Sequence, residues 1–298
     1  MEPAGAHPGL ADGVFAKSLV TKAAMAALKL AIGSLTGSKA LIADGVNSLA
    51  DVLTNGGAWL GFRLAQSPAD DDHHYGHGGF EALTALLLGV LVLAGAVALI
   101  WDAVFRPAPE LDGRDACLVV GAAVVSIGAN LWLARITLFA ATTLQSPTLM
   151  ALARDNRSDV LASGLVVLGA GANLAGLTWA EPAAAGLIAV MIAPLGLRSA
   201  RDGLDILLDR VSDKDLRARI SLCAKEVGGV RSVHNVRVHP LGRGQRVDLD
   251  IALDPQLNVL AAHRVARAVE AAIVAAEHTV LSVHVGMLPD GVAPARAP

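Results

Sequence analysis

Four oxygen-bearing side chains occur as two pairs with helical spacing inside otherwise apolar stretches. Asn47 and Asp51 are four residues apart, and so are Asp155 and Asp159. A spacing of four places both members of a pair on one face of a helix. An ionised carboxylate inside a bilayer is costly unless it pairs, faces water or binds a cation. The two pairs therefore predict two helices that face each other across a cation site.

A second explanation of these residues needs no bound ion. In it, the first pair hydrogen-bonds to neighbouring helices, and the second pair forms ion pairs with Arg154 and Arg157. Because two independent pairs share the same spacing, we favour the cation site.

A polar loop at residues 66–79 holds a second set of metal-binding residue types. Asp70, His73 and His77 combine one carboxylate with two imidazoles, which are common ligands of divalent transition metals. A single loop with this spacing can fold around one ion. The alternative is a solvated turn that happens to be rich in histidine and aspartate.

Six apolar segments of membrane-spanning length must position these side chains. Only 17% of the residues are charged, and uncharged runs of about twenty residues match a hydrocarbon core of about 30 Å. The first segment is the least lipid-like, because it contains Lys17, Lys22 and Lys29. The pattern predicts an all-α six-helix transmembrane domain with spans at 14–35, 40–64, 82–101, 116–134, 147–177 and 183–197.

The sequence becomes polar after residue 198 and alternates between helical and strand patterns. The order is helix, strand, strand, helix, strand, with strands expected at 233–238, 247–253 and 280–285. This order predicts a small α+β domain. We expect a disordered tail at 1–12, the transport domain at 13–203, a cytoplasmic regulatory domain at 204–288 and a second disordered tail at 289–298.

Composition and charge limit the possible partners and locations. The chain is 54% hydrophobic, with a mean hydropathy of +0.53, so a lipid bilayer is expected to surround it. Its net charge of -3 and the lack of a basic run argue against nucleic acid. Six spans place both termini on one side, and Lys17, Lys22, Arg198 and Arg201 favour the cytoplasm. We expect a multi-pass protein of the bacterial inner membrane with both termini cytoplasmic.

Three motifs together resemble the signatures of the cation diffusion facilitator family, in the family's order. They are Ala40–Asp51 (ALIADGVNSLAD), Pro68–His77 (PADDDHHYGH) and Asp155–Asp159 (DNRSD). The resemblance implies six spans, a C-terminal ferredoxin-like domain, a homodimer, and exchange of a divalent metal ion for protons. It implies a secondary active transporter, not an enzyme, which has no prosthetic group and carries a divalent cation (Mn²⁺, Fe²⁺ or Zn²⁺) as its cargo.

The resemblance also implies three metal sites. The transport site corresponds to Asn47, Asp51, Asp155 and Asp159. The loop site corresponds to Asp70, His73 and His77, and a regulatory site in the soluble domain corresponds to His234, Asp250, His263 and His284.

Some positions depart from the family pattern. Zinc-transporting members commonly have aspartate where Asn47 stands and histidine where Asp155 stands, so this quartet offers only oxygen ligands. Oxygen ligands suit Mn²⁺ better than Zn²⁺, and we expect Mn²⁺ ahead of Fe²⁺ and Zn²⁺.

Other departures concern the contacts between subunits and the regulatory site. The sequence Gly79-Phe80-Glu81 lacks the basic residue that often precedes this glutamate at a dimer contact. In the regulatory site, Asp250 replaces a histidine and Gly286 replaces a carboxylate, which reduces its ligand set.

Two other functions fit parts of the sequence. One is a metal-sensing or scaffolding membrane protein of the same family, of the magnetosome type, in which the quartet is structural. The other is an exporter of zinc or iron. A membrane hydrolase is disfavoured, because the sequence has no G-x-S-x-G motif and no phosphate-binding glycine loop.

Overall fold

A computed structural model of the chain describes residues 8–65, 67–68, 70–74, 76–106, 110–211, 213–241 and 244–291. The predicted tail residues 1–7 and 292–298 lie outside this range. The chain divides into two compact units. One contains the residues up to Leu60 together with Ala85–Ala200, and the other contains Gly61–Thr84 together with the residues from Arg201.

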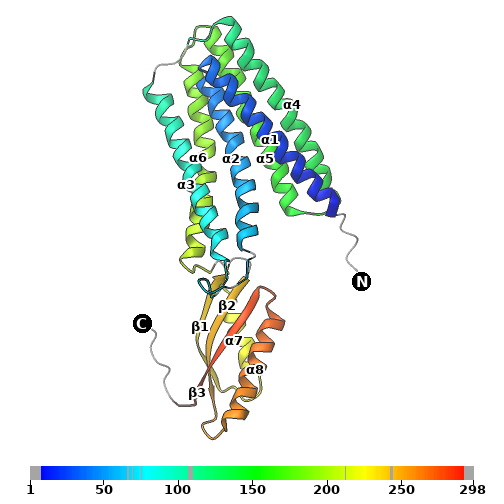
Figure 1. Cartoon of the computed structure of the whole chain (residues 1–298), viewed down its shortest axis with the longest axis vertical. Coiled ribbons are helices and arrows are strands. Elements are labelled where there is room, and N and C mark those ends of the chain that lie inside the picture. The colour runs from blue at the N-terminus through cyan, green and yellow to red at the C-terminus, as the bar shows by residue number, and fades with distance from the viewer. Residues whose placement is uncertain are drawn as a thin grey trace. The chain divides into compact units, whose positions relative to one another are not determined.

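Six long helices follow one another before the soluble domain. They are α1 (Pro8–Thr36), α2 (Lys39–Ala65), α3 (Gly79–Phe105), α4 (Gly113–Thr143), α5 (Pro147–Leu174) and α6 (Ala180–Leu207) (Figure 1). Four of them, α1, α3, α4 and α6, are by length and composition able to cross a membrane. Helices α2 and α5 have similar lengths but carry the two polar pairs. The predicted six-helix domain is confirmed.

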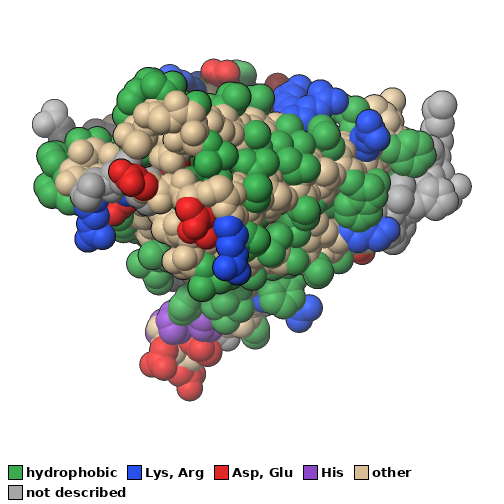
Figure 2. Space-filling view, turned by 90° about the horizontal axis from the view of Figure 1, so that it is seen from above, with side chains coloured by type: hydrophobic (Ala, Val, Ile, Leu, Met, Phe, Trp, Pro, Cys, Tyr) green, Lys and Arg blue, Asp and Glu red, His purple; other side chains and the backbone are tan. Residues whose placement is uncertain are grey.

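The helical unit has an interior of small residues and an apolar exterior. Its core contains many buried alanines with Leu41, Val119, Val166 and Ile188. Large apolar side chains such as Leu87 and Leu168 are exposed. Figure 2 views the molecule from above and shows hydrophobic side chains interspersed with polar groups and scattered charges. An exterior of this kind is suited to lipid contact.

Local capping signals set some of the helix ends. Ser146 is the N-cap of α5, with its side chain accepting a hydrogen bond from the backbone N–H of Leu149, and Pro147 is the first helical residue. Asp112 caps α4 in the same way through Asp115.

The predicted domain boundaries need correction at three points. Helix α1 begins at Pro8, so residues 8–12 are not a disordered tail; proline is compatible with the first turn of a helix. Helix α6 extends to Leu207, across the predicted boundary at 203. Strand β3 ends at Pro289, one residue into the predicted second tail.

The soluble domain has the predicted order of elements. They are α7 (Leu216–Lys225), β1 (Ser232–Leu241), β2 (Gly244–Leu253), α8 (Val259–Ala276) and β3 (Val280–Pro289) (Figure 1). The sheet order is β1-β2-β3, with β1 antiparallel and β3 parallel to β2. A parallel neighbour requires a crossover, which α8 supplies. Apolar residues of α7, α8 and the sheet share one core, so the predicted α+β fold is confirmed.

Candidate metal transport site

Helices α2 and α5 bring the two predicted polar pairs together. The side-chain amide of Asn47 on α2 donates a hydrogen bond to Oδ1 of Asp159 on α5, over 2.8 Å. Asp159 is buried, and Asp51 is partly buried. The pairs therefore face each other, as their spacing predicts.

A cavity opens beside this contact. Its volume is about 300 Å³. The four predicted residues line it together with five others, namely Ser158, Met191, Pro194, Leu195 and Arg198. The cavity has room for a partly hydrated ion next to the carboxylates.

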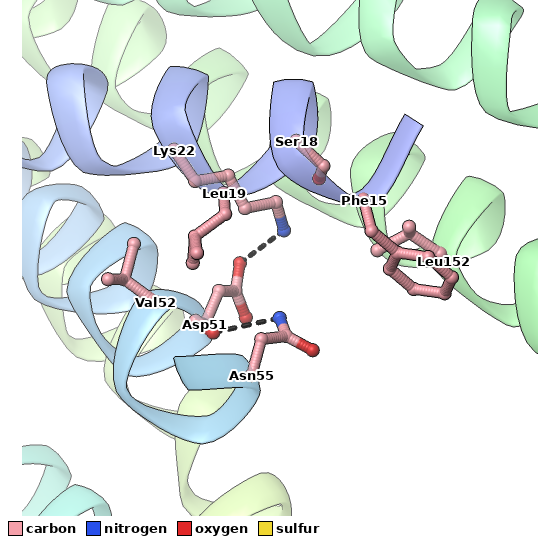
Figure 3. Close-up of a pocket in the computed structure, with 8 residues that line it drawn as sticks. All are labelled: Phe15, Ser18, Leu19, Lys22, Asp51, Val52, Asn55 and Leu152. Carbon is pink, nitrogen blue, oxygen red and sulfur yellow. Dashed lines mark hydrogen bonds and ion pairs between the residues drawn. The ribbon is translucent and has the colours of Figure 1, made fainter. Parts of the chain in front are cut away.

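A lysine of α1 lies between two of the predicted ligands. The Nζ atom of Lys22 is 2.5 Å from Oδ2 of Asp51 and 2.8 Å from Oδ2 of Asp159. Figure 3 shows Lys22 reaching from α1 toward Asp51 on α2. The ion pairs neutralise part of the charge that burial would otherwise make costly.

The sequence does not predict Lys22 as part of this site. Its position near the start of the first span favours a charge that sets membrane orientation, yet the side chain is buried and paired. A signal was present in the spacing. Lys22 and Lys29 are seven residues apart, and so are Asp44 and Asp51, which fits two ion pairs between antiparallel helices.

The second of these ion pairs lies deeper in the bundle. Nζ of Lys29 is 2.9 Å from Oδ2 of Asp44, and both side chains are fully buried. Lys29 also donates to Ser48 (3.0 Å), and Ser163 donates to Oδ2 of Asp44 (2.7 Å). This pair joins α1 and α2 to α5, apart from the cavity.

The alternative arrangement with arginine partners is not formed. Within the described residues, neither Arg154 nor Arg157 makes an ion pair with Asp155 or Asp159. Asp155 lines the cavity but is exposed, and among the described ion pairs it has none with Lys22.

The predicted loop residues do come together. Ligand atoms of Asp70, His73 and His77 all lie within 4.8 Å of one another, the one group of at least three His, Cys, Asp or Glu that does so in the described part of the chain. The carboxylate oxygens of Asp51, Asp155 and Asp159 therefore do not all lie within this distance of one another. In the loop, Oδ1 of Asp70 lies 3.2 Å from Nδ1 of His73, and Oδ2 lies 3.3 Å from Nε2 of His77.

Backbone contacts prepare the loop residues for a cation. The backbone N–H of His73 donates to Asp70 over 2.6 Å; this bond, more than the others, holds the pKa of Asp70 below its ordinary value, so the carboxylate is charged at neutral pH. Nδ1 of His77 donates to the carbonyl of Pro68 (3.1 Å). Its Nε2 therefore carries the lone pair that a metal requires.

Phe80 packs against a histidine of this loop. Its ring stacks on His77, with centroids 5.7 Å apart and an interplanar angle of 22°. Phe80, which occupies the position where the family often has a basic residue, thus packs against the imidazole ring of His77.

The four predicted regulatory residues are only partly adjacent within one chain. His234 and Asp250 are paired across β1 and β2, but His284 on β3 lies opposite Asp248. His263 lies on α8 and is exposed.

Asp250 has taken the space that a side chain at position 286 would need. A Cβ added to Gly286 would lie 2.1 Å from Oδ1 of Asp250. The other oxygen, Oδ2, accepts a hydrogen bond from Asn235 (2.7 Å). Asp250 and Gly286, the two departures from the family pattern in this site, are therefore in direct contact, and Asp250 leaves no room for a side chain at position 286.

Comparison with known proteins decides the family. Residues 16–208 match the family model described as the cation efflux transmembrane domain, and residues 212–289 match the cation efflux protein cytoplasmic domain. The chain belongs to the cation diffusion facilitator family. This family consists of membrane-embedded transporters of divalent metal cations, which confirms the resemblance found in the motifs. The match of this transporter to the ZT_dimer cytoplasmic domain also implies dimerisation.

Several family members resemble this transporter over most of its length. The uncharacterized transporter YdbO of Bacillus subtilis is 32% identical, over 90% of this chain and 92% of its own. The magnetosome protein MamM of Magnetospirillum gryphiswaldense is 30% identical, over 90% and 85%. A solved structure of the C-terminal domain of MamM is 32% identical and covers 26% of this chain and 96% of its own, with a TM-score of 0.25.

Proposed function

We propose that this transporter exports Mn²⁺ in exchange for protons, in preference to Fe²⁺ and Zn²⁺, through a site formed by Asn47, Asp51, Asp155 and Asp159. One observation carries the proposal: two of these carboxylates, from α2 and α5, already hold a positive charge between them beside a cavity. A divalent ion can take that position.

The chemistry of the quartet supports exchange for protons. A carboxylate binds either a proton or a metal ion at the same oxygen atoms, so the two compete. An ion that enters the cavity displaces protons, and carboxylates that lose the ion regain them. The binding energy of one cation is in this way linked to release of the other.

The ligand types support Mn²⁺ as cargo. Three carboxylates and one amide provide only oxygen, which suits Mn²⁺, whereas Zn²⁺ binds best with nitrogen or sulfur among its ligands. The amide nitrogen of Asn47 is occupied by Asp159, so its oxygen is the atom offered to the ion.

The loop and the soluble domain supply further proposed sites. We assign Asp70, His73 and His77 to a second divalent-metal site, on the strength of their convergence. The proposed regulatory site consists of His234, Asp250, His263 and His284. These side chains could surround one ion only if a second chain contributed ligands or the domain rearranged. The match to a cytoplasmic domain supports placing both termini in the cytoplasm. We assign the protein to a bacterial inner membrane.

A second candidate function is metal sensing or scaffolding with little transport. It is favoured by the similarity to magnetosome proteins, which are named for an organelle and not for transport. An exporter would carry metal across the membrane, whereas a sensing or scaffolding protein would carry little or none.

Uptake by reconstituted proteoliposomes tests the proposal. Mn²⁺, Fe²⁺, Zn²⁺ and Co²⁺ are compared side by side, with and without an opposing proton gradient. We expect the fastest uptake for Mn²⁺, with proton counterflow and a lower initial rate when the gradient is collapsed. Absence of flux for all four ions would support the sensing function, and flux that is insensitive to the gradient would exclude antiport.

A further inference from the structure

The ammonium group of Lys22 is bound as a cargo ion would be bound. It contacts one oxygen each of Asp51 and Asp159, which belong to two different helices. Both carboxylates are proposed ligands of the transported metal. An ammonium and a divalent cation cannot share the same two oxygens, because they repel each other at that distance.

A purely structural lysine of the same helix behaves differently. Lys29 is fully buried and pairs with Asp44, which does not line the cavity. This pair already fixes α1 against α2 without any contact with the quartet. Lys22 is therefore not needed to hold α1 against α2, and its position beside the cavity indicates a different function.

A small second cavity gives the Lys22 side chain a place to move. It has a volume of about 20 Å³ and is lined by Lys22, Asp51, Ser18 and Asn55 with four apolar residues (Figure 3). This volume is about that of one water molecule. The Ser18 hydroxyl and the Asn55 amide oxygen can accept hydrogen bonds from a displaced ammonium.

We propose that Lys22 is a tethered cation that occupies the transport site between loads, so that binding of the metal and binding of Lys22 to Asp51 and Asp159 exclude each other. The inference rests on the proposed transport site. Its consequence is that Lys22 lowers the affinity for metal and helps to expel the ion. Protons compete with both cations for the same carboxylate oxygens.

Binding of Mn²⁺ to the purified full-length protein tests the exclusion. The bound fraction is measured from the loss of the electron paramagnetic resonance signal of free Mn²⁺, and the component that disappears in Asp51→Ala is taken as the transport site. Lys22→Met should lower the Kd of this component by about tenfold or more, since a competing bound state is removed. In transport assays, the same variant should lower both KM and the maximal rate, because release is slowed.

Lys29→Met is the matched control. It removes a buried ammonium from the same helix but leaves the quartet untouched, so the Kd for Mn²⁺ should stay within about twofold of wild type. A Kd in Lys22→Met that is equal to or higher than that of wild type would overturn the inference, because a lysine that only positions the carboxylates gives that result. If Asp51→Ala leaves Mn²⁺ binding intact, the proposed transport site itself is wrong.

Lys22→Arg decides the matter if Lys22→Met does not fold. A guanidinium binds two carboxylates more firmly than an ammonium does, so this variant should bind Mn²⁺ more weakly than wild type. Unchanged or tighter binding would contradict the tethered cation.

Discussion

At the residue scale, the properties of the transport site depend on which atoms Asn47 and Asp155 present. Asn47 donates its amide hydrogen to Asp159, and an aspartate at this position would instead place two carboxylates against each other. All four residues of the quartet line the cavity, and Asp155 is the exposed one among them. It is therefore the position at which a new ligand can be introduced with the least disturbance of the existing contacts.

Asp155→His should raise the ratio of Zn²⁺ to Mn²⁺ initial uptake rates by about tenfold, because an imidazole favours zinc. Adding Asn47→Asp should raise it further by completing a set with three carboxylates and one nitrogen. The measurement is the uptake ratio for wild type, each single variant and the double variant. A wild type that already prefers Zn²⁺, or a ratio that does not rise with Asp155→His, would remove the support for manganese.

The facing of the two polar pairs could be predicted from the sequence, and the lysine partner of their carboxylates could not. Four-residue spacing fixes the face of a helix, so Asn47 with Asp51 and Asp155 with Asp159 were correctly placed on facing sides. Spacing does not say which third helix covers that face. Lys22 was therefore interpreted as a charge near the membrane surface until the packing of α1 showed its partners.

At the element scale, close contact between helices depends on small residues. Helices α3 and α6 meet at Gly89 and Gly196. A Cβ added to Gly89 would lie 2.2 Å from the backbone nitrogen of Ala200, and one added to Gly196 would lie 2.7 Å from that of Leu93. Both contacts involve backbone, which cannot move aside as a side chain can. Small residues of this kind allow membrane helices to approach closely.

Gly89→Ala should therefore lower stability by about 1–3 kcal/mol, the usual cost of overpacking. Gly121→Ala on α4 is the control, since an added Cβ there meets no atom within 4 Å. The midpoint of thermal unfolding in detergent should fall for Gly89→Ala and stay level or rise for Gly121→Ala. Equal midpoints would show that α3 and α6 are not packed this closely.

The soluble domain should be stable by itself at neutral pH and lose stability in acid. Arg219 donates to Glu277 (2.6 Å) and Asp213 (2.9 Å), and these bonds lower the pKa of both acids. A lowered pKa contributes stability above the ordinary values of 4.5 and 3.8, and that contribution is lost as the pH falls below them.

The measurement is the thermal midpoint of a segment of residues 211–290, expected to be a folded dimer without metal, between about pH 7 and pH 3. Arg219→Ala should lower the midpoint modestly at pH 7 and make its decline in acid shallower. A monomeric, unfolded segment by light scattering and circular dichroism would contradict its independence. An unchanged decline in Arg219→Ala would contradict the role of the ion pairs.

The number and type of the helices and strands could be predicted from the sequence. Some of the residues at which they begin or end, and some of the contacts between helices, could not. Apolar runs of membrane-spanning length predict the helices, and alternating apolar residues predict the strands. The start of α1 at Pro8 was missed because the composition of residues 1–12 resembled a tail. The contact of Gly89 with Gly196 connects residues more than a hundred positions apart, and no local pattern indicates it.

At the scale of the whole molecule, three carboxylates that lower the hydropathy of α2 and α5, those of Asp44, Asp51 and Asp159, meet lysines of α1 inside the bundle. Asp51 and Asp159 share one lysine of α1, and Asp44 has another. Large apolar side chains cover much of the exterior of the helical unit, while Lys22, Lys29, Asp44 and Asp159 are buried inside it. Because Lys22 is buried, the orientation in the membrane rests on Lys17, Arg198 and Arg201 and on the match to a cytoplasmic domain.

The most direct test of the proposed transport site is the initial rate of Mn²⁺ uptake by proteoliposomes containing Asp51→Ala or Asp159→Ala. Asp102→Ala is the matched control, because Asp102 is also a helix carboxylate paired with a lysine, Lys39, but does not line the cavity. We predict that the first two variants insert and dimerise normally but lose uptake, and that the control keeps it. Normal uptake in either Asp51→Ala or Asp159→Ala would contradict the site.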